Sequence, residues 1–171
     1  MKQLFLLFTL TSLLLSSALD MDSFEADFNQ VVTDDKGKKL SYSGSIVASK
    51  PQYALWSYKN PIEKDVYITA DRVTVIEPNI EQAIIRRIAS DFDFFNMMQK
   101  AKKITDKKYI ATLNSSKYTI LLEDSMIKSI SYLDEFENKV NISFSKQKKN
   151  HKVSQDIFIV KIPLEYDIIR D

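Results

Sequence analysis

Short segments in which apolar and polar side chains alternate recur along most of this chain, and turn-forming residues separate them. The first such segment places Phe24, Ala26 and Phe28 between polar neighbours. A period of two residues is the pattern of a half-buried strand, and many short strands joined by tight turns are typical of an antiparallel sandwich or barrel. The remaining predicted strands are residues 42–49, 53–58, 66–70, 73–77, 80–88, 109–113, 118–123, 127–133, 140–144 and 157–162.

One segment breaks this pattern, because residues 91–103 contain no β-branched side chain and no two-residue alternation. A polar residue can cap its start, and lysines at its end suit the negative end of a helix dipole. We therefore predict one amphipathic helix, on which Phe94, Phe95 and Met98 share a face. Such a stripe usually packs into a core. A sheet that curls around a single helix can also leave an apolar pocket, and Met side chains adapt to variable apolar shapes.

Residues 1–18 have the pattern of a secretory signal peptide. Lys2 supplies the positive start, residues 4–15 form a predominantly apolar run, and Ser16 and Ala18 are the small residues that favour cleavage after Ala18. The apolar run of about 12 residues is shorter than the roughly 20 needed to span a bilayer. We predict that residues 1–18 are removed and that residues 19–171 form a single exported domain.

The composition disfavours the common kinds of catalytic and metal-binding site. The chain has no cysteine, and its one histidine, His151, lies in a charged run that we expect to form a solvated hairpin tip over residues 146–152. Catalytic triads and zinc sites therefore lack their usual parts. Without Lys2 the formal net charge is zero, which gives no bias toward nucleic acid. We expect no enzymatic activity, catalytic residue, metal or cofactor, and no nucleic-acid partner.

The stretch over residues 44–83 contains an ordered series of strands and turns. A glycine opens a strand, Lys-Pro follows, a tryptophan comes five residues after that proline, and two further turns and a Glu-Gln pair complete the series. This series resembles the LolA family of lipoprotein carriers. The first predicted strand and the C-terminal part of the chain extend the resemblance over nearly all of residues 19–171. The positions concerned are Gly44, Lys50, Pro51, Trp56, Asn60, Pro61, Glu77, Pro78, Asn79, Glu81, Gln82, Asn138, Phe144, Asn150, Phe158, Pro163 and Asp167.

The resemblance implies a mainly β fold, an open and incomplete antiparallel β-barrel (a half-barrel) with an inserted helical lid over an apolar cavity. It implies a periplasmic chaperone that binds the acyl chains of lipoproteins released from the inner membrane and delivers them to the outer membrane. The implied partners are acylated lipoproteins, an inner-membrane ABC transporter of the LolCDE type, and an outer-membrane acceptor that is LolB-like or of another kind. We expect a monomer.

The resemblance also nominates site residues. Lys50 stands where the family has a basic residue, usually Arg, that holds the lid closed, and Lys lacks the planar donor fork of Arg. Trp56 stands at a family tryptophan that we place in the sheet, facing the cavity. An exposed turn lysine and a core tryptophan are the ordinary alternatives for these two positions. With the predicted helix, the candidate acyl-binding residues are Phe28, Trp56, Phe94, Phe95 and Met98.

One departure from the family and one alternative function accompany this interpretation. Only residues 19–23 separate the predicted cleavage site from Phe24, so an N-terminal helix seen in many family members is absent or very short. The lid would then consist mainly of residues 91–103. The alternative is a periplasmic lipid-binding or acyl-sensing regulatory protein of the same fold, because lipoproteins and free lipids both present acyl chains.

Overall fold

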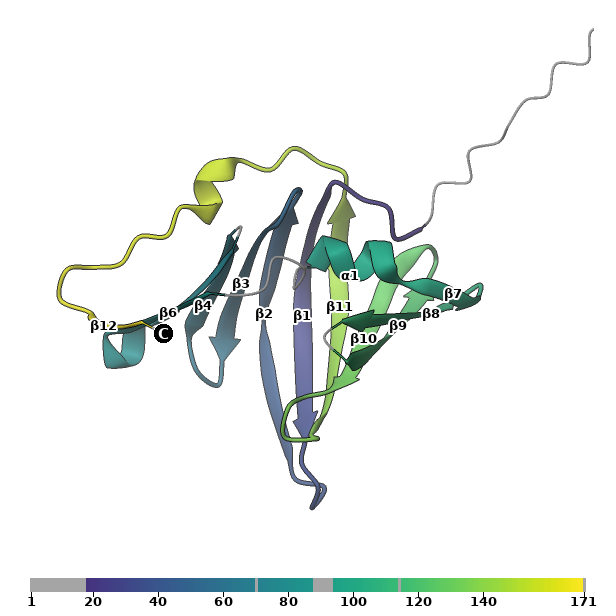
Figure 1. The fold of residues 1–171 in the computed structure, drawn as a ribbon, viewed down its shortest axis with the longest axis horizontal. Helices are drawn as coiled ribbons and strands as arrows, with labels where there is room; N and C mark the ends of the chain where they lie inside the picture. The colour runs from purple at the N-terminus through teal and green to yellow at the C-terminus, as the bar shows by residue number, and fades with distance from the viewer. Residues whose placement is uncertain (1–17, 70, 88–93, 114, 171) are drawn as a thin grey trace, which may run out of the picture.

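The structure, a computed structural model, describes residues 18–69, 71–87, 94–113 and 115–170. These residues form one strongly curved 12-stranded sheet in the order β12-β6-β5-β4-β3-β2-β1-β11-β10-β9-β8-β7 (Figure 1). The strands are β1 (Ser23–Thr33), β2 (Lys39–Ser49), β3 (Tyr53–Asn60), β4 (Lys64–Thr69), β5 (Arg72–Glu77), β6 (Gln82–Arg87), β7 (Lys102–Thr105), β8 (Lys108–Leu113), β9 (Ser116–Glu123), β10 (Met126–Leu133), β11 (Lys139–Lys149) and β12 (Asp167–Arg170).

The strands predicted from alternation up to residue 144 all coincide with observed strands, with small shifts at their ends. The largest shift is at the end of β11, which continues to Lys149, five residues beyond the predicted end at residue 144. The start of β6 shifts by two residues, because a short 3-10 helix, η1 (Pro78–Ile80), precedes it. The sheet is mixed, which corrects the expectation of a purely antiparallel one: β12 runs parallel to β6. The backbone N–H of Asp167 donates to the carbonyl oxygen of Glu81 at 2.8 Å, so the C-terminal segment enters beside the start of β6 and continues in the same direction.

Local irregularities in the strand pairing help to curve the sheet. The register shifts between Glu25 and Asp27 where β1 meets β11, and it shifts again between Ser43 and Gly44 where β2 meets β3. An extra residue in one strand of a pair bends that strand and increases its twist. The sheet therefore has a concave face, which carries the inward-pointing side chains, and a convex face.

The single α-helix in the described part of the chain, α1 (Phe94–Lys100), lies in front of β1 and β11 in Figure 1. Residues 91–93 of the predicted helix lie outside the described residues. The predicted C-terminal end at residue 103 is wrong, because Lys102 and Lys103 belong to β7 and are paired with Ile110 and Tyr109 of β8. The backbone groups at this edge of β8 would otherwise have no strand partner, and that requirement overrides the local helical pattern.

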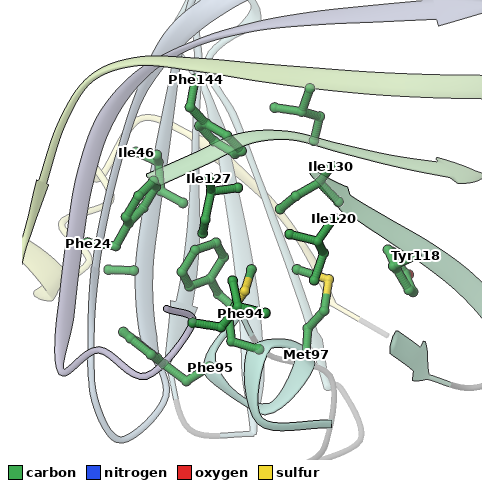
Figure 2. Close-up of a cluster of buried hydrophobic side chains, with 14 of the residues drawn as sticks. Phe24, Ile46, Phe94, Phe95, Met97, Tyr118, Ile120, Ile127, Ile130 and Phe144 are labelled. Atoms are coloured by element: carbon green, nitrogen blue, oxygen red, sulfur yellow. The ribbon is translucent and has the colours of Figure 1, made fainter. Parts of the chain in front are cut away.

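The hydrophobic core lies between α1 and the concave face. Phe24 of β1 is fully buried, and all four apolar residues of α1 are buried with it. Figure 2 shows Phe94 and Met97 pointing from the helix toward the sheet. The core also includes the first described residues of the chain, since Leu19 and Met21 are 3% and 2% exposed.

The C-terminal segment corrects the prediction of a strand over residues 157–162. Residues 155–158 form a second 3-10 helix, η2 (Gln155–Phe158), whose start is capped by the Ser154 side chain accepting from the Asp156 N–H. The Phe158 ring stacks on Tyr53 of β3, with centroids 5.5 Å apart. Of the apolar residues at the start of the predicted strand, only Phe158 packs against the sheet, while Ile157 and Ile159 stay exposed.

His151 is not part of a solvated hairpin tip, contrary to the sequence prediction. The preceding lysines continue β11, and His151 begins the C-terminal segment. Its side chain is 30% exposed, and its Nε2 lies 3.0 Å from a carboxylate oxygen of Glu25. The Ser23 hydroxyl donates to the His151 carbonyl oxygen at 2.7 Å and accepts from the His151 N–H at 2.9 Å. These contacts fasten the start of the segment to β1, which is why it does not project into solvent.

Candidate ligand-binding cavity

A cavity of about 250 Å³ lies between α1 and the concave face of the sheet. Its wall is mostly aliphatic and aromatic, with contributions from β1, β3, β4, α1, β8, β9, β10 and β11. Apolar walls with few polar groups are typical of sites for small apolar ligands. The lining residues are Gln30, Trp56, Tyr58, Val66, Ile68, Phe94, Met97, Leu113, Tyr118, Ile130, Tyr132 and Ile142.

Strand geometry explains why the lining residues occur at alternate positions. Successive side chains of a strand point to opposite faces, so β3 presents Trp56 and Tyr58 to the cavity, and β4 presents Val66 and Ile68. The register pairs Trp56 with Val66, so that these two residues occupy the same face of neighbouring strands. The alternation seen in the sequence therefore builds one continuous apolar wall.

Aromatic contacts close the end of the cavity nearest to α1. The Phe94 ring stacks on Phe24 of β1 with centroids 5.1 Å apart, and it meets Phe95 edge to face at 5.5 Å. Offset-stacked and edge-to-face pairs are favourable ring arrangements, worth about 0.5–1.5 kcal/mol beyond burial. Met97 adds an unbranched, flexible side chain to the same wall.

A second aromatic group occupies the cavity floor farther along β1. The Phe28 ring meets Trp56 and Tyr58 edge to face, with centroids 5.2 Å and 5.0 Å away. The Tyr58 hydroxyl donates to Gln30 Oε1 at 3.0 Å. Lys64 places its Nζ 4.7 Å from the centre of the Tyr58 ring, within the range of a cation–π contact. This end of the cavity therefore combines apolar rings with a few polar groups.

Burial changes the acidity of the tyrosines in this wall. Desolvation, with a smaller contribution from nearby tyrosines, raises the pKa of Tyr58 to about 12. Desolvation is also the main reason why the pKa of Tyr132 is raised to about 12. Both hydroxyls are therefore neutral at physiological pH, and they act as hydrogen-bond donors and acceptors inside an apolar cavity.

Gly44 of β2 is required by the close packing under this aromatic group. A Cβ at this position would overlap the carbonyl oxygen of Ser57 and lie 3.0 Å from the Phe28 ring. The absence of a side chain lets the Phe28 and Tyr58 rings meet across β2. The glycine that opens the family-like series in the sequence thus has a packing role in the cavity floor.

Lys50 lies at the turn between β2 and β3, outside the cavity. Its Nζ is 2.8 Å from Asp22 and 3.5 Å from Asp20. The hydrogen bond to Asp22 is the main reason why the pKa of Lys50 is raised. Among the described residues its ion pairs are thus with the N-terminal segment that precedes β1. That segment is held further by the Asp22 N–H, which donates to Asn150 Oδ1 at 2.8 Å.

The five residues nominated for acyl binding occupy three kinds of place. Trp56 and Phe94 line the cavity, whereas Phe28 supports Trp56 and Tyr58 from the cavity floor. Phe95 and Met98 are buried in the core beside the cavity and do not line it. Ten of the twelve lining residues were not predicted from the sequence, although strand alternation starting from Trp56 could have identified Tyr58. The ten are Gln30, Tyr58, Val66, Ile68, Met97, Leu113, Tyr118, Ile130, Tyr132 and Ile142.

The described residues contain no group of three or more His, Asp or Glu side chains that could hold a metal ion. No helix in the described ranges has the length and apolar character needed to cross a membrane.

Comparisons of sequence identify similar proteins that cover this chain almost completely. The family model described as outer membrane lipoprotein carrier protein LolA matches residues 20–93. An outer-membrane lipoprotein carrier protein of Campylobacter jejuni is 40% identical over 171 residues, covering 99% of this chain and 100% of that protein. A protein of the same description from Helicobacter pylori strain J99 is 35% identical and covers 88% of this chain and 82% of its own length. One from Wolinella succinogenes is 30% identical, with 93% of each covered.

Comparison with solved structures gives the same fold at much lower sequence identity. A LolA superfamily protein from Nitrosomonas europaea superposes with a TM-score of 0.54 at 10% identity, covering 82% of this chain and 91% of the other. A conserved protein from Thermus thermophilus superposes with a TM-score of 0.53 at 11% identity, covering 90% and 93%. At such identities the likeness concerns the fold alone.

Proposed function

The chain belongs to the LolA family of outer-membrane lipoprotein carrier proteins, and from this premise we propose that it binds the acyl chains of its cargo in the cavity between α1 and the concave face. Carriage of lipoproteins is not an enzymatic activity. The observation that supports this site is the apolar wall that Trp56, Phe94 and their neighbours form around about 250 Å³. In this proposal the sheet is the open half-barrel and α1 is its lid.

The size of the cavity indicates how cargo is accommodated. Pockets for small ligands usually measure about 300–1,000 Å³, so a cavity of about 250 Å³ is small for cargo with several acyl chains. Loading then requires α1 to move away from the sheet. Helix α1 has only seven residues, and Met97 and Met98 can repack around different chains.

The energetics favour a carrier in which contacts between α1 and the sheet are replaced by contacts with the bound acyl chain. Burial of acyl chain contributes about 0.8 kcal/mol per methylene group, or roughly 12 kcal/mol for a sixteen-carbon chain. Moving α1 breaks contacts such as the stacking of Phe94 on Phe24. The cost of breaking them offsets part of the gain, which keeps the affinity low enough for the cargo to be passed on.

The proposal also includes export of the protein to the periplasm and transfer of cargo between two membrane partners. Removal of residues 1–18 would release the mature protein into the periplasm with Leu19, which is buried in the core, as its first residue. There it would receive acylated lipoproteins from an ABC transporter of the LolCDE type and deliver them to an outer-membrane acceptor. N-terminal sequencing of the purified protein tests the export step, and a retained Met1 would contradict it.

Native mass spectrometry of the protein purified from its own periplasm tests the site. We expect a bound acylated lipoprotein, and we expect Val66→Phe, which narrows the cavity, to reduce the loaded fraction several-fold. Thr112→Phe adds the same ring at an exposed position of β8 and should load normally. Free phospholipid or fatty acid as the only ligand would favour the lipid-binding alternative. Equal loading of both variants would place the cargo outside this cavity.

A further inference from the structure

The cavity is not uniformly apolar, because Gln30 and Tyr58 contribute polar groups to its wall. Gln30 lies six residues beyond Phe24 on the same face of β1, which corresponds to roughly 20 Å along an extended strand. Phe24 is the residue on which Phe94 of α1 stacks. The polar pair therefore lies at the end of the cavity that is remote from the helix.

The hydrogen-bond capacity of this pair is only partly used within the protein. The Tyr58 hydroxyl donates to Gln30 Oε1 at 3.0 Å. In the part of the chain that the structure describes, the Gln30 amide nitrogen has no acceptor, although it carries two N–H donors. A donor that faces an apolar cavity favours a ligand with an acceptor at that point, because an unpaired polar group is costly once water is excluded.

Lys64 adds positive charge beside the pair. The register pairs Lys64 with Tyr58, and the Lys64 Nζ lies 4.7 Å from the Tyr58 ring and 5.9 Å from the Tyr42 ring. A cation held over two rings makes this end of the cavity electropositive. An oxygen acceptor with partial negative charge is thus favoured over a plain hydrocarbon.

We propose that Gln30 and Tyr58, with Lys64 beside them, form a carbonyl-binding subsite for the ester carbonyl oxygen at the polar end of an acyl chain. The inference rests on the proposed function and deepens it, because it gives the bound chain a direction. The ester is held near Gln30, and the hydrocarbon tail extends toward Phe94 and Met97. The roughly 20 Å between the two ends is comparable to the hydrocarbon of one bilayer leaflet, about 15 Å.

Trp56 provides the readout, since it is the only tryptophan of the chain and lines the cavity. The ligands are methyl dodecanoate and 1-methoxydodecane, an ether of matched chain length that lacks the carbonyl group. We expect the delipidated wild-type protein to bind the ester about five- to tenfold more tightly, which is the range of one net hydrogen bond. Gln30→Leu and Tyr58→Phe, prepared separately, should each lose most of this preference while still binding the ether.

Tyr53→Phe is the matched control, because it removes a tyrosine hydroxyl from the convex face, where the ring stacks on Phe158. It should keep the full preference for the ester. A wild-type protein that binds both ligands equally, or a Gln30→Leu protein that keeps the preference, would overturn the subsite and leave the carrier function intact.

Failure of both ligands to change Trp56 fluorescence would count against the cavity itself. Dodecanoate bound more tightly than the ester, with this advantage lost in Lys64→Gln, would assign the subsite to a carboxylate and overturn the ester assignment.

Discussion

Lys50 joins two parts of the chain that are far apart in sequence, because its ammonium group contacts Asp22 and Asp20 ahead of β1. The segment that it holds contains Leu19 and Met21, which are buried in the core that α1 covers. A gating role for Lys50 would therefore act through the N-terminal segment. This path differs from a direct latch on α1.

Replacing Lys50 with Leu should leave the fold intact but loosen the N-terminal segment. Exposed ion pairs are usually worth about 0–1 kcal/mol, so the free energy of unfolding should change little. Hydrogen exchange at residues 19–22 should become faster, and loading or release of lipoprotein should be impaired. Lys128→Leu, which breaks an exposed pair with Glu123 at 2.7 Å, serves as the control. Normal lipoprotein sorting in cells that carry Lys50→Leu would limit Lys50 to a turn residue.

The buried tyrosines predict a dependence of stability on alkaline pH. The pKa of Tyr58 and of Tyr132 is raised to about 12, mainly by desolvation, whereas an unfolded chain has tyrosine pKa values near 10. The folded state thus keeps protons that the unfolded state releases. Stability from this source is complete below pH 10 and falls as the pH rises from 10 toward 12.

Absorbance of phenolate at 295 nm measures this titration directly. Two tyrosines of the folded protein should ionise near pH 12, and Tyr58→Phe should remove one of them. Tyr166→Phe, which deletes a partly exposed phenol in the C-terminal segment, is the control and should leave both late-titrating groups in place. Ionisation of every tyrosine near pH 10 in the folded protein would show that water reaches the cavity wall freely.

At the scale of elements, α1 contributes side chains both to the core and to the cavity wall. Phe95 and Met98 pack beside the cavity, whereas Phe94 and Met97 form part of its wall. The helix is short, and isolated helices of this length are unstable in water. Its position therefore depends on these four side chains, which makes it sensitive to a single buried charge.

Met97→Glu should abolish acyl binding, because a carboxylate would replace an apolar group that is 8% exposed in the cavity wall. The measurement is titration with methyl dodecanoate, followed by Trp56 fluorescence. Gln99→Glu introduces the same group at an exposed position of α1 and should bind normally. Circular dichroism should show that the sheet persists in both variants. Retained affinity in a folded Met97→Glu protein would exclude α1 from the ligand site.

The sequence predicted the long strands well because their signal is local. Residues such as Phe24, Ala26 and Phe28 alternate with polar neighbours whatever surrounds them. The short edge strands β7 and β12 could not be predicted in this way, because their residues are mostly exposed and show no clear alternation. Each of them exists because a neighbouring strand offers unpaired backbone groups, and that is a property of the assembled sheet.

The candidate site was likewise predictable only in part from the sequence. Trp56 and Phe94 could be nominated from the resemblance and the aromatic helix, and both line the cavity. Tyr118 and Tyr132 come from strands that are distant in the sequence, so their place opposite Tyr58 depends on the register of the whole sheet. The orientation of α1 likewise decided that Met97 faces the cavity and Met98 does not.

At the scale of the whole molecule, the two faces of the sheet have separate tasks. The concave face forms the cavity under α1, and the C-terminal segment crosses to the far edge of the sheet (Figure 1). The segment is fastened at its start by Ser23 and His151, in its middle by Phe158, and at its end by the pairing of β12 with β6. An open sheet has exposed edges, and β12 covers the edge at β6.

This division predicts that the segment stabilises the sheet without taking part in ligand binding. Phe158 is 4% exposed, and its replacement by Ala should lower the free energy of unfolding by about 3 kcal/mol. With its middle anchor lost, β12 should separate more often from β6. Hydrogen exchange at residues 83–85 should then become faster, while exchange in β1 and β11 should change little.

Leu164→Ala provides the control, because Leu164 is fully exposed in the same segment and its loss should change stability by less than about 0.5 kcal/mol. Below its lowered melting temperature, the Phe158→Ala protein should bind methyl dodecanoate as tightly as the wild type, since Phe158 packs on the side of β3 opposite to Trp56. A loss of affinity in the folded variant would mean that the convex face controls the shape of the cavity. The curvature of the sheet would then depend on the C-terminal segment as well as on the register shifts within it.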